Sequence, residues 1–224
     1  MDRIEWIILD DGTDKVGDLF AASGLKNVRY IACPEGTKMP IGAKRNRLND
    51  LATGEICVCM DDDDYYPPDR IRHAVTKLRS VAGRRIPVVG ASMLYLFFTD
   101  RDEIWSVGPY GPNHCTNGTM AYWSTYGKEN RYEDTAEKAE ERHFLKDWKT
   151  PIIQVNPEDT MLVICHSSNT FDKRILLQKK HPSMKLVQTK LKYIIKNKAH
   201  RDFYLSLAEE YKTMPILDLS GSTV

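Results

Sequence analysis

The sequence predicts an α/β fold. Short apolar segments alternate with helical segments along the first hundred residues, which is the pattern of strand–helix units built on a mostly parallel sheet. Several apolar segments are hydrophobic on both faces and end in Asp or Gly, as strands covered by helices on both sides do. We therefore expect a central, mostly parallel sheet flanked by helices. The 224 residues suit one domain, or one domain with a small appendage.

The first half predicts its elements in regular order. Residues 5–9 form an apolar strand that the turn residues Asp10 to Thr13 terminate, and a helix over residues 15–23 follows. Residues 28–31 predict a second strand. Pro40 precedes a helix over residues 41–52, which Gly54 closes. Residues 56–60 predict a buried strand, residues 70–81 an amphipathic helix and residues 87–98 a long apolar strand.

The second half is less regular. Residues 104–107 and 118–123 predict strands joined by a loop rich in Gly, Pro, Asn and His. A helix is expected over residues 136–148, followed by strands over residues 151–155 and 161–165. Residues 185–211 are expected to be mostly helical, with a polar tail over residues 218–224. The predicted organisation is one domain over residues 1–184 with a helical extension, residues 185–224, packed on it.

Composition excludes several classes of protein. Lys and Arg number 32 against 31 Asp and Glu, a formal charge of +1, so no nucleic-acid partner is expected. No apolar run approaches the roughly 18 residues of a membrane span, and the first residues do not have the form of a signal peptide. Five cysteines are an odd and sparse number for a disulfide scaffold. These features favour a reduced, cytoplasmic enzyme domain.

Four consecutive aspartates, Asp61 to Asp64, give the strongest chemical signal. They follow an apolar strand directly, and ionised carboxylates crowded there need a cation. Ligands of open α/β sheets bind at the carboxyl ends of strands. Mg²⁺ and Mn²⁺ prefer carboxylate oxygens, and a phosphate can complete their coordination. We expect a metal–phosphate site here; a solvated acidic turn is the alternative.

Two further groups favour a nucleotide. Lys44 and Arg45 lie in the first turns of a helix, where the macrodipole disfavours positive charge unless an anion binds. Both are therefore expected to face a phosphate, although a solvated basic helix face is about as plausible. Asp10 and Asp11 end the first strand and can accept hydrogen bonds from a nucleobase or a ribose, but Asp-Gly is also a common turn.

Two signals in the second half are weaker. Glu140 and Glu141 lie on the helix expected over residues 136–148, where adjacent acids usually form the wet face. His166 follows the strand expected over residues 161–165, and a lone His at such a place is more often structural than a metal ligand.

In order, these segments resemble the family 2 glycosyltransferases of the GT-A fold. The resemblance covers roughly residues 4–166 and depends on the combined spacing of the motifs. The matching segments are Asp10-Asp11-Gly12-Thr13, Arg45-Asn46 with Gly54-Glu55, the run Asp61 to Asp64 with Pro67-Pro68, and Glu140-Glu141.

The resemblance implies an inverting, hexosyltransferase-like enzyme. A nucleotide-sugar, with a UDP-sugar favoured, would be the donor, a glycan or glycoprotein the acceptor, and Mn²⁺ or Mg²⁺ the cofactor. Residues 1–100 would bind nucleotide and metal, and residues 101–184 the acceptor. By the same resemblance the nucleotide-binding residues are Asp10, Asp11, Lys44, Arg45 and Asp62, the metal ligands Asp61, Asp63 and His166, and the catalytic base Glu141. The expected location is the cytoplasm, that of a host cell if the source is viral.

Aromatic residues are the expected lining of the sugar and acceptor sites, because flat rings pack on sugar faces. About half of them are expected to be ordinary core residues instead. They are Tyr65, Tyr66, Trp105, Tyr110, Trp123 and Tyr126.

The chain departs from the family pattern at two places. Family members usually begin with one more strand, ending in a Pro-Thr-x-Asn-like loop, ahead of the Asp-Asp-Gly strand, and this first strand is missing here. The acid pair reads Glu-Glu where many members have Glu-Asp. The missing strand leaves open a non-catalytic metal- or nucleotide-binding relative. Another Mg²⁺-dependent enzyme is a second alternative, but the Gly-rich loop and Lys of a nucleotidyltransferase are not visible, and the early Asp-x-Asp of a phosphohydrolase is absent.

Overall fold

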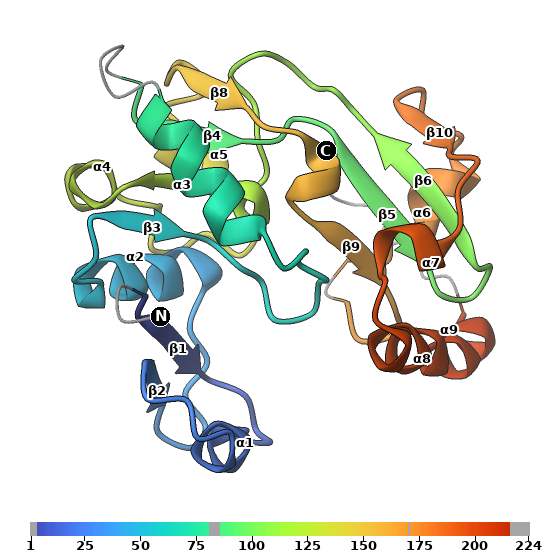
Figure 1. Cartoon of the computed structure of the whole chain (residues 1–224), viewed down its shortest axis with the longest axis horizontal. Helices are drawn as coiled ribbons and strands as arrows, with labels where there is room; N and C mark the ends of the chain where they lie inside the picture. The colour runs from blue at the N-terminus through green and yellow to red at the C-terminus, as the bar shows by residue number, and fades with distance from the viewer. Residues whose placement is uncertain (1–3, 81–85, 170, 216–224) are drawn as a thin grey trace.

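The computed structural model describes residues 4–80, 86–169 and 171–215 (Figure 1). Its strands are β1 (Trp6–Asp10), β2 (Val28–Ala32), β3 (Ile56–Val58), β4 (Val88–Gly90), β5 (Leu94–Phe98), β6 (Glu103–Val107), β7 (Ala121–Trp123), β8 (Ile152–Gln154), β9 (Leu162–Cys165) and β10 (Met184–Leu186). Its α-helices are α1 (Gly17–Ala22), α2 (Ile41–Leu51), α3 (Arg70–Ser80), α4 (Ser124–Glu129), α5 (Glu141–Phe144), α6 (Arg174–Gln178), α7 (Leu191–Ile194), α8 (Lys198–Ser206) and α9 (Ala208–Thr213), with 3₁₀ turns η2 (Asn117–Thr119) and η3 (Pro157–Asp159).

The strands of the described residues form three sheets, with orders β1-β2, β3-β7-β4-β8 and β10-β6-β5-β9. Helices flank them, so the α/β class is confirmed (Figure 1). The pairing is mixed rather than mostly parallel: β1–β2, β4–β8 and β5–β9 are parallel, and the other pairs are antiparallel. Each antiparallel pair includes β6 or β7, strands of the second half. The turn that joins β5 to β6 is too short for a crossover helix.

The long strand expected over residues 87–98 is two strands in two sheets. The chain leaves one sheet after β4 and enters the other at β5. At the break, the backbone N–H of Ser92 donates to the side chain of Gln154 (2.8 Å), and the N–H of Ala91 donates to Thr119 Oγ1 (2.9 Å). Both strands are buried, so apolar character continues across the break and hides it.

The helix expected over residues 136–148 is wrong except for the single turn of α5. Ala139, Lys146, Asp147 and Trp148 have φ values of 52°, 54°, 52° and 62°, a left-handed conformation that ends a right-handed helix on either side of α5. Residues 185–211 are mostly helical, as expected, in the three short helices α7, α8 and α9, but the segment begins in strand β10, which pairs with β6. Helices α4 and α6 were not anticipated. Val81 and the tail over residues 218–224 lie outside the described residues.

Several polar residues lie together at one edge of the sheet β3-β7-β4-β8. Strand β7 runs antiparallel to both β3 and β4, so β3 and β4 are parallel to each other, and β8 is parallel to β4. The carboxyl ends of β3, β4 and β8 therefore share an edge. The aspartate run follows β3, Ser92 follows β4 and Gln154 ends β8.

The two-stranded sheet is attached to this framework through Glu5. Its carboxylate accepts hydrogen bonds from the backbone N–H groups of Thr53 (2.6 Å) and Gly54 (3.0 Å), just before β3. This contact holds the start of β1 beside the start of β3. None of the helices in residues 4–80, 86–169 and 171–215 has the length and apolar character needed to cross a membrane.

Candidate active site

The four aspartates differ in environment although they are adjacent. Asp62 and Asp63 are exposed, whereas Asp61 and Asp64 are partly buried. The N–H of Asp61 donates to the Tyr66 hydroxyl (2.7 Å), and Asp64 Oδ1 accepts from the N–H of Ile164 in β9 (2.9 Å). Burial, reinforced by the charge of Asp63, raises the pKa of Asp64 to about 7. Asp61 and Asp64 therefore anchor the turn through hydrogen bonds, and the carboxylates of Asp62 and Asp63 are exposed to solvent.

Gly118 lets the backbone of η2 approach Asp61 closely. A Cβ at position 118 would lie 2.6 Å from Asp61 Oδ2 and 2.9 Å from the Tyr66 hydroxyl oxygen. Such a contact is shorter than real Cβ atoms make, so any larger residue would displace the Asp61 carboxylate. No sequence pattern marks Gly118 as important.

Arg45 joins the aspartate run to the acid pair. Its Nη2 lies 3.0 Å from Asp61 Oδ1, and its Nε donates to Glu140 Oε1 at 2.6 Å. The amide of Asn117, oriented so that both of its polar atoms have partners, accepts from Arg45 Nη1 at 2.5 Å. Burial would lower the pKa of Arg45, but Asp61 and Glu140 outweigh it and raise that pKa well above its ordinary value. Acids far apart in sequence therefore converge on one buried guanidinium.

Glu141, next to this ion pair, has the character of a proton acceptor. Burial, with the neighbouring charge of Glu140, raises the pKa of Glu141 to about 7, although Arg45 opposes the change. A carboxyl with a pKa near neutrality can take a proton from a substrate and release it again.

Helix α2 also fixes the segment that leads to the acid pair. Asn46, buried on α2, donates from Nδ2 to the carbonyl of Tyr132 (2.9 Å) and to Asp134 Oδ1 (2.7 Å), and its Oδ1 accepts from the N–H of Tyr132 (2.9 Å). The N–H of Gly42 donates to the carbonyl of Ala136 (3.1 Å). Gly42 and Asn46 both lie on α2, and their contacts with residues 132–136 were not expected from the sequence.

Asp10, Asp11 and Lys44 form a second group at the end of β1. Asp10 shapes its own loop: its carboxylate accepts from the N–H of Gly12 (2.8 Å) and from the Tyr30 hydroxyl, and the Tyr30 hydrogen bond is the main cause that lowers its pKa. Asp11 Oδ1 accepts from Lys44 Nζ at 2.9 Å. Burial opposes ionisation of Asp11, yet the N–H of Met39 and the Lys44 ammonium lower its pKa.

Lys44 and Arg45 thus point to different carboxylates from one helix. Lys44 pairs with Asp11, and Arg45 with Asp61 and Glu140. The Lys44 side chain keeps 29% of its surface exposed, whereas Arg45 keeps 13%. Lys44 is accordingly the better placed of the two to meet a ligand arriving from solvent.

The predicted metal ligands fit a divalent cation in part. Asp63 is exposed, and its Oδ2 lies 3.9 Å from His166 Nε2 and accepts from Asn169 Nδ2 at 3.1 Å. Carboxylate oxygens suit Mg²⁺ or Mn²⁺. The His166 ring fits less well, because both of its nitrogens already have partners: Nδ1 accepts from the N–H of Ser168 (3.2 Å), and Nε2 lies 2.9 Å from Asn169 Nδ2. Within the described ranges no three His, Cys, Asp or Glu side chains form a ready metal cluster.

The aromatic residues expected at the site differ in how exposed they are. Tyr65 and Tyr126 are buried at 8% exposure, and Trp105 and Trp123 are partly buried against hydrophobic clusters. Tyr66 supports the aspartate turn through its hydroxyl. Tyr110 is half exposed, at 50%.

Comparison with known proteins agrees with this geometry. The family model described as glycosyl transferase family 2 matches residues 1–106. Two crystal structures of S. aureus TarS, one titled TarS 1-349, each superpose with a TM-score of 0.51 at 14% identity over 92% of this chain. The chain spans 61% and 37% of the lengths of those two structures. No curated protein matches the sequence.

The family match covers the Asp-Asp-Gly turn, the Arg-Asn pair and the aspartate run. The structural likeness extends over both halves of the chain and establishes the fold. Residues 1–106 are therefore similar to glycosyl transferase family 2, and the chain has the GT-A fold.

Proposed function

We propose that the protein is a metal-dependent, inverting glycosyltransferase that moves a sugar from a nucleotide-diphosphate sugar to an acceptor hydroxyl. A UDP-sugar is the favoured donor, and a glycan or glycoprotein the favoured acceptor. One observation carries the proposal: Arg45 contacts both Asp61 and Glu140, so the aspartate run and the acid pair lie beside one another.

The chain's own groups suit a single displacement. The Glu141 carboxylate takes the proton of the acceptor hydroxyl while that oxygen forms a bond to the anomeric carbon. The bond from the anomeric carbon to the phosphate oxygen breaks, and its electron pair leaves with the nucleoside diphosphate. Attack from the face opposite the leaving group inverts the anomeric centre. The step needs one base and no protein nucleophile.

The donor would lie beside the first turns of α2, where Lys44 and Arg45 meet Asp11 and Asp61. Asp11 and Lys44 would contact the nucleotide, and Asp10 would hold the loop that presents them. Asp62 is exposed beside the aspartate turn and would meet the nucleotide from the other side. Arg45 would act indirectly, by holding Asp61 and Glu140 in place.

Asp63 and Asp61 would hold Mn²⁺ or Mg²⁺. His166 would join them only if one of its ring nitrogens gave up its present partner, the N–H of Ser168 at Nδ1 or Asn169 Nδ2 at Nε2. When bound, the cation would supply positive charge that offsets the charge developing on the leaving diphosphate.

A donor-hydrolysis assay tests the proposal. The chain is incubated with Mn²⁺ and a panel of UDP- and GDP-sugars, and release of nucleoside diphosphate is measured. We expect release from at least one UDP-sugar and its loss in Asp63→Ala. A chain that binds nucleoside diphosphate but releases none from any donor would instead be a non-catalytic relative.

A further inference from the structure

A shallow pocket lies beyond the carboxyl ends of β4 and β8, at the same sheet edge as the aspartate run. Its volume is about 320 Å³, near the lower end of the range of about 300–1,000 Å³ for ligand sites. Its lining residues are Ser92, Pro109, Tyr110, Gly111, Pro112 and Gln154. None of them takes part in the chemistry proposed above.

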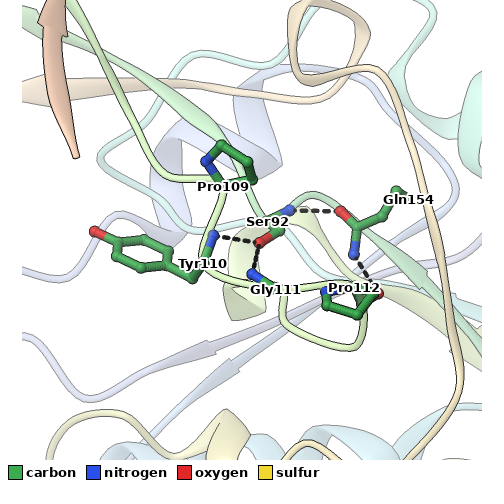
Figure 2. Close-up of a pocket in the computed structure, with 6 residues that line it drawn as sticks. All are labelled: Ser92, Pro109, Tyr110, Gly111, Pro112 and Gln154. Carbon is green, nitrogen blue, oxygen red and sulfur yellow. Dashed lines mark hydrogen bonds between the residues drawn. The ribbon is translucent and has the colours of Figure 1, made fainter.

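The loop that forms the pocket is held in place by two side chains (Figure 2). The Ser92 hydroxyl accepts from the N–H groups of Tyr110 (2.8 Å) and Gly111 (3.0 Å). The Gln154 amide donates to the carbonyls of Pro112 and His114, each at 2.9 Å. An irregular loop fixed by buried and sheet-end side chains is preorganised, which lowers the entropic cost of binding a ligand.

Three aromatic rings form a row that starts at the pocket. The Tyr110 and His114 ring centroids are 4.9 Å apart, and those of His114 and Trp148 are 4.3 Å apart. Tyr110 keeps 50% of its surface exposed. Rings supported in this way present flat apolar faces together with polar edges.

The same loop connects the rings to the acid pair. Asn117, three residues after His114, accepts from Arg45 Nη1 at 2.5 Å, and Arg45 Nε donates to Glu140 Oε1 at 2.6 Å. Three residues of chain span at most roughly 11 Å, so the His114 end of the row of rings lies close to the acid pair.

We propose that Tyr110 and the pocket beside it bind a pyranose ring of the acceptor, whose apolar face stacks on the tyrosine ring. The inference rests on the proposed function, because it assigns the acceptor side of the same reaction. The pocket volume of about 320 Å³ is large enough for a single sugar ring.

Saturation-transfer NMR with methyl pyranosides tests this without donor or metal. The probes are the methyl β-pyranosides of glucose, galactose and N-acetylglucosamine, titrated against the full chain. We expect binding of at least one probe, weakened about three- to tenfold in Tyr110→Ala, the loss that corresponds to one aromatic stacking contact. Tyr110→Phe, which keeps the ring, should bind like the wild type. Tyr193→Ala is the matched control, since Tyr193 is an exposed tyrosine, at 65%, on α7.

Three results would overturn the inference. The first is that the wild type binds none of the probes. The second is that Tyr110→Ala binds as tightly as the wild type. The third is that Phe203→Ala weakens binding and Tyr110→Ala does not. Phe203 lines the other aromatic pocket, of about 290 Å³, with Tyr65, Tyr66, His200 and Tyr204. Donor hydrolysis by the wild type is measured separately. Its absence alongside pyranoside binding at Tyr110 would remove the proposed function and support the carbohydrate site.

Discussion

Arg45 Nε donates to Glu140 Oε1 at 2.6 Å, while Glu141, the next residue, has a pKa raised to about 7. Adjacent acids of the same type therefore have different chemistry. Glu140 is a buried partner of a guanidinium, and its charge helps to keep the proton affinity of Glu141 high. This division agrees with Glu141 as the base and gives Glu140 a positioning role.

Replacing Glu141 should slow transfer without weakening donor binding. Glu141→Gln keeps the size of the side chain but cannot take a proton, so we expect a loss of about 10²–10⁴-fold in kcat. In the wild type, kcat/KM should rise with pH up to about 7 and then level off, since the base acts when deprotonated. Initial rates across pH measure both effects. If Glu140→Gln abolished transfer and Glu141→Gln did not, the base would be Glu140.

The same substitution should stabilise the protein at neutral and higher pH. The pKa of Glu141 is raised from 4.5 to about 7, so the folded state binds the proton more tightly than the unfolded state. The stabilising effect of that proton is complete below about pH 4.5 and is lost as pH rises through about 7. Glu141→Gln should therefore raise the free energy of unfolding by up to about 3 kcal/mol above pH 7 and leave it nearly unchanged at low pH. Urea unfolding measures this, with the exposed Glu137→Gln as the control; equal effects at both pH values would contradict the assignment.

Removing the guanidinium of Arg45 should destabilise the fold. Arg45→Ala leaves Asp61 and Glu140 without their shared partner, and Glu140 is only 6% exposed. Loss of one member of a buried pair costs about 3–5 kcal/mol. The matched control is Arg79→Ala, because Arg79 pairs with Glu55 on the surface, at 58% and 66% side-chain exposure, and should cost less than about 1 kcal/mol. Denaturant unfolding of both variants decides the matter, and similar losses would argue against a buried role for Arg45.

A methyl group at position 118 should disturb the aspartate turn. In Gly118→Ala the new Cβ would meet Asp61 Oδ2 at 2.6 Å and Met161 Sδ at 2.8 Å, so these side chains must move. Overpacking of this kind costs about 1–3 kcal/mol. Gly111→Ala is the control, because its Cβ would meet nothing within 4 Å. Thermal unfolding compares them; a Gly118→Ala variant as stable as the control would show that Asp61 moves freely.

Metal and nucleotide should bind cooperatively. Asp61 and Asp63 offer few ligands by themselves, and a diphosphate completes the coordination shell. We expect Mn²⁺ to bind weakly alone and about tenfold or more tightly with UDP or GDP, a coupling of about 1.4 kcal/mol. Asp63→Ala should abolish the coupling, and Asp69→Ala, which alters an exposed aspartate on the surface, should not. Calorimetry measures it, and equal Mn²⁺ affinity with and without every nucleotide would contradict a shared site.

Much of the first half could be predicted from sequence because its signals are local. The apolar segments around β1 and β3 and the helix α2 end at turn or cap residues that mark them directly. The second half could not, because tertiary contacts override local preference. Residues 136–148 have helical composition, yet Lys146, Asp147 and Trp148 adopt positive φ around α5.

The candidate site was predictable by residue type but not by pairing. Asp61 and Glu141 were identified from their motifs, whereas the target of Arg45 could not be, since an arginine at a helix start suits a phosphate as well as a buried carboxylate. No sequence pattern marks Asn117 or Gly118. Their roles depend on tertiary contacts, of Asn117 with Arg45 and of Gly118 with Asp61.

Helix α2 ties the two halves of the chain into one cooperative unit. Asn46 binds Tyr132 and Asp134, and Arg45 binds Glu140 as well as Asp61, so buried polar groups of the first half have partners in the second. A fragment that stopped at the end of the family match would lose those partners. Excision of residues 1–106 should therefore yield an insoluble or unfolded polypeptide, and any recombination of modules between related chains must exchange α2 together with the segment from Tyr132 to Glu141.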